Sequence, residues 1–167
     1  TIDFGTGNVD ASITAAGNGI EAQTSGAGKI TVNAYGTISN AAGDLGPNGG
    51  TLQNNESGIW TKQTGTGNIE INTGTKSITA GIGTLDYGIY AQAAGGAIDI
   101  TTGTGTVTGG DDGIHAEVLS GSGNIDITTG GEVTSLTDIG IFALSTSNGT
   151  GDITVTTSSR PSPGTRE

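Results

Sequence analysis

The tetrapeptide Gly88-Ile89-Tyr90-Ala91 belongs to a series of related phrases that return through the chain at a near-constant interval. The other members are Gly19-Ile20-Glu21-Ala22, Gly58-Ile59-Trp60-Thr61, Gly113-Ile114-His115-Ala116 and Gly140-Ile141-Phe142-Ala143. The successive glycines lie 39, 30, 25 and 27 residues apart. Self-similarity at such a period indicates a repeat protein, in which each repeat buries its apolar face against its neighbours.

A second phrase, Ile-x-Ile or a close variant, falls between the copies of the first. It occurs at Ile2-Asp3-Phe4, Ile30-Thr31-Val32, Ile69-Glu70-Ile71, Ile98-Asp99-Ile100, Ile125-Asp126-Ile127 and Ile153-Thr154-Val155. Its first residues lie 28, 39, 29, 27 and 28 residues apart, so the two phrases keep the same wavelength. Because strand side chains alternate between faces, the outer residues of each phrase share a dry face and the middle residue takes the wet face.

A third apolar position lies between the two phrases in each repeat, at Ile13, Ile38, Ile78, Val107 and Val133. One repeat therefore offers three short strands, separated by Gly, Thr, Asn and Ala. This pattern predicts an all-β, right-handed parallel β-helix (a solenoid) of about 5–6 turns, each of roughly 27–30 residues with three strands. An antiparallel sandwich is the alternative fold, but a sandwich does not need identical phrases at a fixed period.

The composition is rich in glycine and poor in charge, with 33 Gly and 13% charged residues. We expect glycine to serve tight corners that need a positive φ. The chain contains no cysteine, which excludes disulfides and thiolate metal sites. Its net charge is −11, and residues 1–157 hold no arginine. An acidic rod of this kind is not expected to bind nucleic acid, whose phosphates need cations, or an anionic membrane surface.

The repeats predict a parallel β-helix over residues 1–157, followed at 158–167 by a Ser/Pro/Arg-rich tail or linker. Residues 40–57 lengthen one repeat by roughly ten residues and contain Gly-Pro-Asn-Gly-Gly, a strong turn signal. A smaller excess at 80–87 falls at the same point of the next repeat. We expect the two insertions to form neighbouring surface loops, which in repeat proteins often belong to the binding face.

Gly67-Asn68-Ile69-Glu70-Ile71, Gly123-Asn124-Ile125-Asp126-Ile127 and the Gly-Ile-x-Ala phrases resemble the β-helical passenger regions of bacterial autotransporters (type V secretion) and related filamentous-haemagglutinin-like adhesins. The resemblance covers residues 1–157 and is one of repeat style. It implies a right-handed β-helix, location at the bacterial cell surface (outer membrane) or secretion, and a part in adhesion or aggregation. It also implies contact with a membrane only through a C-terminal barrel domain, which this sequence does not contain.

The third residue of each Gly-Ile-x-Ala phrase is expected to point outward, so that stacking aligns Glu21, Trp60, Tyr90, His115 and Phe142. Three of the six Trp, Tyr and Phe residues in the chain occupy this stripe. Trp60, Tyr90, His115 and Phe142 are therefore the candidate ligand-binding residues, for a sugar ring or a partner protein. The alternative is that the rings only support the stacked strands through cross-strand contacts.

A stripe of carboxylates, Glu70, Asp99 and Asp126, occupies the wet centres of three successive Ile-x-Ile phrases. Carboxylates about 5 Å apart on adjacent strands repel one another, can raise each other's pKa, and could recruit Ca²⁺, which takes oxygen ligands. The alternative is a solvated face that keeps the rod soluble and prevents mispairing of strands. We predict no metal site and no cofactor.

Asp111-Asp112, with Asp86 one turn earlier, is the arrangement that suggests catalysis. It looks like the paired aspartates of polygalacturonases, and glycoside hydrolysis needs two carboxyl groups across the scissile bond. The Gly-His-Gly and Arg-Ile-Lys phrases of those enzymes are absent, and His115, the single histidine, has no Ser or Cys motif around it. Asp111-Asp112 also suits a corner turn, where Asp is favoured.

These observations predict that the chain is not an enzyme but a non-catalytic structural rod of a bacterial cell-surface or secreted protein, presenting an adhesion or self-association face. Its expected partners are a host or environmental glycan or protein, or a second copy of the chain. The alternative function is a polysaccharide-active β-helix enzyme, a hydrolase or lyase acting through surface carboxylates. A deep acidic cleft would favour the enzyme, and a flat or shallow stripe would favour the adhesin.

Overall fold

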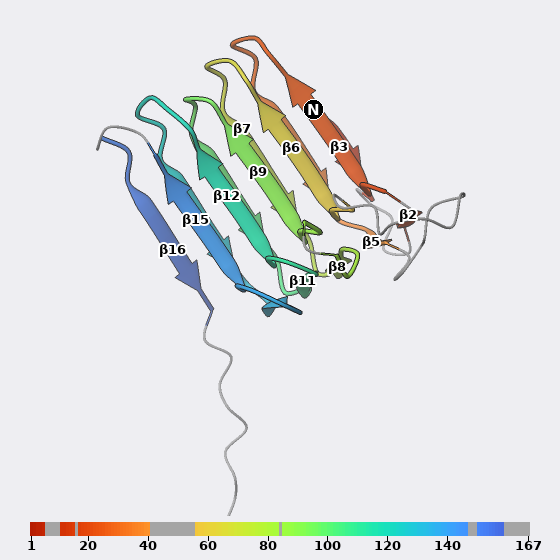
Figure 1. Ribbon diagram of the computed structural model, residues 1–167. Helices are drawn as coiled ribbons and strands as arrows, with labels where there is room; N and C mark the ends of the chain where they lie inside the picture. The colour runs from red at the N-terminus through yellow and green to blue at the C-terminus, as the bar shows by residue number, and fades with distance from the viewer. Residues whose placement is uncertain (6–10, 16, 41–55, 84, 147–149, 159–167) are drawn as a thin grey trace, which may run out of the picture.

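The structure, a computed structural model, describes residues 1–5, 11–15, 17–40, 56–83, 85–146 and 150–158. These residues form sixteen short strands and no helix, and the strands lie in three parallel sheets (Figure 1). Accordingly, none of the described segments is a helix that could cross a membrane. Most of the predicted insertion at 40–57 and nearly all of the predicted tail lie outside the described residues.

The three sheets run along the length of the coil and take one strand each from every turn. Sheet A is formed by β1 (Ile2–Phe4), β4 (Ile30–Ala34), β7 (Ile69–Thr73), β10 (Ile98–Thr102), β13 (Ile125–Thr129) and β16 (Ile153–Thr157). Sheet B is formed by β2 (Ser12–Ala15), β5 (Thr37–Asn40), β8 (Ile78–Thr79), β11 (Val107–Gly109) and β14 (Val133–Ser135). Sheet C is formed by β3 (Ile20–Thr24), β6 (Ile59–Gln63), β9 (Ile89–Ala93), β12 (Ile114–Val118) and β15 (Ile141–Ser145).

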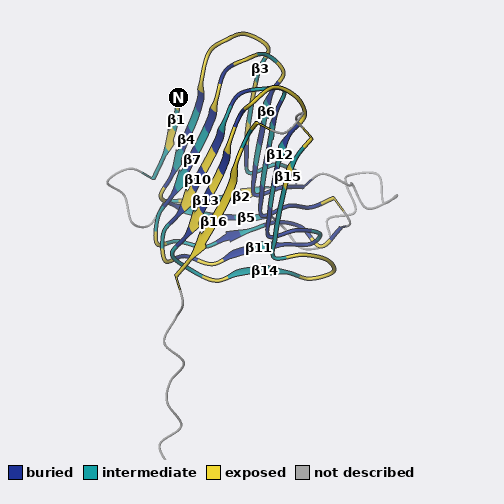
Figure 2. Ribbon diagram, turned by 90° about the vertical axis from the view of Figure 1, so that its left-hand side faces the viewer, coloured by how far each residue is buried: buried dark blue, intermediate teal, exposed yellow. Residues whose placement is uncertain are grey.

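Each strand pairs in parallel with the strand three places further along the chain, so that one turn of the coil stacks on the next. The protein is therefore an all-β parallel solenoid of about five turns with three strands per turn, as the repeats predict. Figure 2 shows the three sheets surrounding a buried interior. The antiparallel sandwich is wrong, because the strand pairs of all three sheets are parallel.

The interior is filled by rows of aliphatic side chains that repeat from turn to turn. The isoleucines of the Gly-Ile-x-Ala phrases form one such row, in which Ile59, Ile89 and Ile114 are fully buried. Ile20 begins this row and Ile141 ends it at the last strand of sheet C, where it is only partly buried. Parallel rows from sheets A and B complete one continuous hydrophobic core.

Several polar residues occur on the buried inner face, and two of them, both in β6, are hydrogen-bonded. Thr61 stands where the other phrases have alanine, and its hydroxyl donates to the carbonyl oxygen of Tyr90 at 3.0 Å. The buried side chain of Gln63 donates to the carbonyl oxygen of Gly28 at 2.7 Å and accepts from the backbone N–H of Gly65 at 2.8 Å. Burial of these groups is tolerated because their hydrogen-bonding capacity is used.

The glycine of the Gly-Ile-x-Ala phrase is required by close packing between turns rather than by its backbone angle. A Cβ atom on Gly88 would lie 2.4 Å from the carbonyl oxygen of Gly113 and 2.7 Å from a methyl carbon of Val107. Gly58 meets its neighbours in the next turn in the same way. Among the described glycines only Gly5 and Gly121 have a positive φ. Glycine therefore serves a positive-φ corner at Gly5 and Gly121, and close packing between turns in this phrase.

The first strand is shifted relative to the alignment of the Ile-x-Ile phrases. Aligning the phrases would pair Ile2 with Ile30, whereas the structure pairs Ile2 with Val32 and Phe4 with Ala34. A shift by two residues keeps the same side chains on the inner face, so the apolar pattern alone does not distinguish the two registers. In the observed register Asn33 donates a side-chain hydrogen bond to Asp3 at 2.6 Å.

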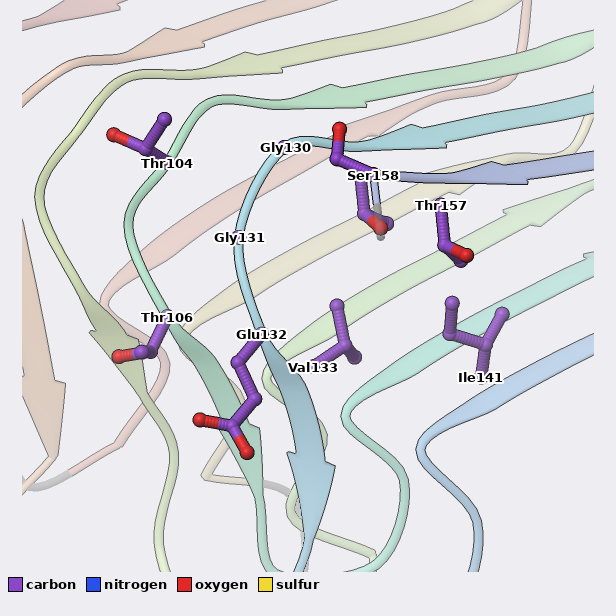
Figure 3. Close-up of a pocket in the computed structure, with 10 residues that line it drawn as sticks. Thr104, Thr106, Gly130, Gly131, Glu132, Val133, Ile141, Thr157 and Ser158 are labelled. Carbon is purple, nitrogen blue, oxygen red and sulfur yellow. The ribbon is translucent and has the colours of Figure 1, made fainter. Parts of the chain in front are cut away.

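Sheet A has one strand more than sheets B and C, and this strand, β16, ends the described coil. Because β16 has a neighbour on one side only, Ile153 and Val155 remain 45% exposed. A hollow opens beside it, lined among others by Thr129, Val133, Ile141 and Thr157 (Figure 3). This end therefore exposes the inner face of the last turn.

Candidate functional site

The outer face of sheet C carries a continuous ladder of stacked rings. Trp60, Tyr90, His115 and Phe142 project from β6, β9, β12 and β15 and are direct neighbours in the strand register. Their ring centroids are separated by 5.9 Å, 5.3 Å and 4.5 Å in that order, with interplanar angles of 9°, 21° and 19°. The structure thus brings all four predicted site residues together in one stack, which we call the ring ladder.

Tyr87 joins the ring ladder from the corner that precedes β9. Its ring centroid lies 5.2 Å from that of Tyr90 and 4.8 Å from that of His115. The side chain is buried, and this burial, with the nearby charges of Asp111 and Asp112, raises the pKa of Tyr87 well above its usual value. Burial and the charge of Glu117 also raise the pKa of Tyr90. Both phenols are therefore neutral hydrogen-bonding groups at physiological pH.

The stacking determines which part of each ring a ligand can reach. Consecutive rings cover each other's faces, so the partly buried rings present mainly their edges to solvent. Phe142 belongs to the last strand of sheet C, so no described strand covers its outer face. A row of longer side chains runs beside the rings, two residues further along each strand, and consists of Gln23, Lys62, Gln92, Glu117 and Leu144. In that row Gln92 donates to Glu117 at 3.0 Å.

Charge is distributed unequally over the rod. Among the described residues that face outward from sheet C, Glu21 and Glu117 are balanced in part by Lys62. Sheet A presents four carboxylates on its outer face, namely Asp3, Glu70, Asp99 and Asp126. In a chain of net charge −11, the ring ladder therefore lies on a face with little net charge.

A cluster of carboxylates lies beside the ring ladder, at the corner between sheets B and C. One carboxylate oxygen from each of Asp111, Asp112 and Asp138 lies within 4.8 Å of the others. Asp112 is buried, with one oxygen 2.7 Å from Nδ1 of His115 and the other accepting from the backbone N–H of Ile139 at 3.3 Å. Asp111 accepts a hydrogen bond from the hydroxyl of Tyr87. Three carboxylates of this kind could ligate a hard cation such as Ca²⁺.

The third aspartate of the catalytic alternative, Asp86, has a structural role in the same corner. Its carboxylate accepts the backbone N–H groups of Glu56 at 2.8 Å and of Gly83 at 2.5 Å. Its backbone carbonyl accepts from Gly110 at 2.7 Å and from Asp111 at 3.1 Å. Asp86 therefore ties together three successive turns at this corner.

The predicted acidic stripe is present on sheet A, where Glu70, Asp99 and Asp126 are neighbours in the strand register. Lys29 forms an ion pair with Glu70 and, with Asn72, lowers the pKa of that carboxyl. Partial burial raises the pKa of Asp99, and the charges of Glu70 and Asp126 add to the effect. Within the described residues, these three carboxylates do not approach each other as closely as the cluster at the B–C corner.

Replacing Asp99 with Asn is expected to stabilise the rod near neutral pH. The folded state holds the Asp99 proton more tightly than the unfolded chain does, so the ionised carboxylate destabilises the fold above its raised pKa. Removing a like charge from a cross-strand position should raise the free energy of unfolding by about 0.2–1 kcal/mol. Thermal melting should show a gain near pH 7 that disappears at about pH 3, where Asp99 is already protonated. An equal gain from Asp152→Asn, which lies outside the stripe, would contradict this explanation.

From the sequence, Asp111 and Asp112 are considered only as the catalytic alternative, and Tyr87 and Asp138 are not singled out. The ring ladder follows from the repeat itself, because the same phrase position recurs in every turn. Tyr87, Asp111 and Asp138 lie in corner segments that differ between turns, so no periodic signal marks them. The available signal was the small insertion at 80–87, which indicates a loop on this side of the rod.

Comparison with known proteins does not assign the chain to a family. No family model, no curated protein and no solved structure matches the chain.

Proposed function

We propose that the chain is a non-catalytic structural rod of a bacterial cell-surface or secreted protein, with the outer face of sheet C as its adhesion or self-association face. The observation that carries the proposal is the ring ladder, in which four successive turns place an aromatic ring at the same outward position. Aromatic residues supply much of the contact energy at binding surfaces, and here they gather on a face with little net charge.

The chemistry of this face suits an extended partner. A row of ring edges runs beside the row of amide and charged groups of Lys62, Gln92 and Glu117, and both rows repeat at the inter-strand spacing of about 4.8 Å. A glycan chain or a strand of a partner protein offers hydroxyl or amide groups that can bond to such a row. A second copy of this face could also pack against it without a large charge repulsion.

The bacterial surface location rests on the repeat style that the chain shares with autotransporter passenger regions, together with the solenoid fold. The non-catalytic assignment is supported by the roles of the aspartates. Asp112 is already bonded to His115 and to the backbone, and Asp86 binds two backbone N–H groups. Carboxylates committed in this way are poorly placed to act as acid and nucleophile across a glycosidic bond. Hydrolysis of an acidic polysaccharide that is lost in Asp111→Asn would support the enzyme instead.

Replacing Trp60 with Ala is expected to weaken binding at sheet C by about tenfold or more, as for an aromatic residue at the centre of an interface. Because Trp60 stacks on Tyr90 alone among the rings, the substitution should cost about 0.5–1.5 kcal/mol of stacking energy and leave the rod folded. Binding would be measured on a glycan microarray, and self-association by sedimentation of the chain alone, well below the melting temperature.

Tyr35→Ala is the matched control, because it removes a ring that is 39% exposed and lies outside sheet C. The control should bind as the unmodified chain does. If Trp60→Ala binds normally, or if Tyr35→Ala loses binding to the same extent, the ring ladder only supports strand stacking and the proposed face is wrong.

A further inference from the structure

The corner between sheets B and C is built from segments of successive turns that lie directly on one another. Backbone hydrogen bonds join Gly110 to Asp86 at 2.7 Å, and Leu136 and Thr137 to Gly109 and Gly110 at 3.0 and 3.1 Å. In Figure 1 this corner lies at the lower ends of β9, β12 and β15. The side chains of these three segments therefore form one surface at the corner.

This surface exposes large apolar side chains that the core does not use. Ile82 is 49% exposed and Leu85 41% exposed in the segment before β9. Leu136 is 59% exposed and Ile139 43% exposed in the segment before β15. Single exposed aliphatic residues are common, but here four of them lie in segments that stack at one corner, and exposed apolar side chains gathered in one region can mark a docking surface.

Acidic side chains gather at the same corner. Asp111 belongs to the middle segment and Asp138 to the last one, and their carboxylates come together with that of Asp112. Asp112 is paired with His115, but no lysine among the described residues pairs with Asp111 or Asp138. Burial and the charges of Asp112 and Asp138 raise the pKa of Asp111, and a cation beside these close carboxylates would reduce their repulsion. We call Ile82, Leu85, Asp111, Leu136, Asp138 and Ile139 the corner patch.

We infer that the corner patch binds a cationic, apolar segment of a partner protein, with a basic side chain on Asp111 and Asp138 and aliphatic side chains on the flanking isoleucines and leucines. Charge complementarity favours such a partner, because arginine is suited to carboxylates and also packs on apolar surface. A second copy of the body of this chain is a poor occupant, because residues 1–157 hold 15 acidic residues and three lysines. A neutral glycan would leave the aliphatic side chains and the carboxylates uncompensated.

The corner patch shares none of its six residues with the ring ladder, so it can bind its partner whether or not the ring ladder binds one. The two surfaces meet at Tyr87, whose ring contacts the ladder and whose hydroxyl bonds to Asp111. Failure of the ring-ladder proposal would therefore leave this inference intact, and the reverse also holds.

The test uses the whole chain and a labelled peptide with alternating leucine and arginine, Leu-Arg-Leu-Arg-Leu, followed by fluorescence anisotropy. Binding should weaken by at least about fivefold in Asp111→Asn/Asp138→Asn, because the charge pairs with both peptide arginines are lost. It should also weaken in Leu136→Ser/Ile139→Ser and at high salt. The peptide Ser-Arg-Ser-Arg-Ser, which has the same charge, should bind much more weakly.

Matched variants separate a local site from general attraction to an acidic rod. Asp99→Asn/Asp126→Asn removes the same charge from sheet A, and Ile153→Ser/Val155→Ser removes side chains of similar exposure from β16. Both should bind the peptide as the unmodified chain does. Equal weakening by either control, or equal binding of the two peptides, would overturn the inference. So would tighter binding in Arg160→Ala/Arg166→Ala, because it would mean that the chain's own arginines occupy the patch.

Discussion

Replacing Ile114 with Asp is expected to unfold the rod. Ile114 is fully buried in β12 of sheet C, between Ile89 and Ile141 in the strand register. An aspartate there has no partner for its charge, and the interior offers no water. Loss of the isoleucine contacts costs about 2–5 kcal/mol, and burial of an unpaired polar or charged group adds several more. The total approaches the roughly 5–15 kcal/mol that stabilises a typical domain.

Circular dichroism and urea unfolding would measure this loss. Thr128→Asp is the matched control, because it places the same side chain on the exposed face of β13. The control should change the unfolding free energy by less than about 1 kcal/mol. An Ile114→Asp variant that melts close to the unmodified chain would contradict the inward orientation of the whole isoleucine row.

The coil and its core could be predicted from sequence because the relevant signal repeats. Every turn places isoleucine at equivalent points, so the inner rows, the wet faces and the ring ladder all follow from two phrases and the alternation of side chains along a strand. The pairing of Trp60 with Tyr90, and of Asp99 with Asp126, is a direct consequence of this period.

The parts that escaped prediction depend on contacts that occur once. The register of β1 was ambiguous because a shift by two residues leaves the same faces buried. The corner patch draws on segments whose lengths differ between turns, so its residues share no sequence position. The contact of Tyr87 with the ring ladder could not be predicted, because the position of the Tyr87 side chain depends on the path of the chain before β9. The turns thus differ mainly in the corner segments between sheets B and C, where insertions change the length of the chain.

The reason for glycine in the main phrase is also a contact between turns, and it leads to a prediction of large effect. Gly88→Ala is expected to destabilise the rod by about 3 kcal/mol or more, because the added methyl group overlaps a packed neighbour that has no room to move. The Cβ atom would lie 2.4 Å from the carbonyl oxygen of Gly113. That oxygen accepts the backbone N–H of Ile89 at 3.0 Å, so moving it breaks the hydrogen bonding between two turns.

Gly17→Ala provides a control with the opposite sign. No heavy atom lies within 4 Å of a Cβ atom at Gly17, and its φ is not in the left-handed region. Alanine there only restricts the unfolded chain, which should stabilise the rod by about 0.4–1 kcal/mol. Thermal melting of the two variants should therefore move in opposite directions from the unmodified chain. A Gly88→Ala variant that melted at or above the temperature of Gly17→Ala would contradict this explanation. The repeated glycine would then be explained by the backbone conformation of that corner and not by close packing between turns.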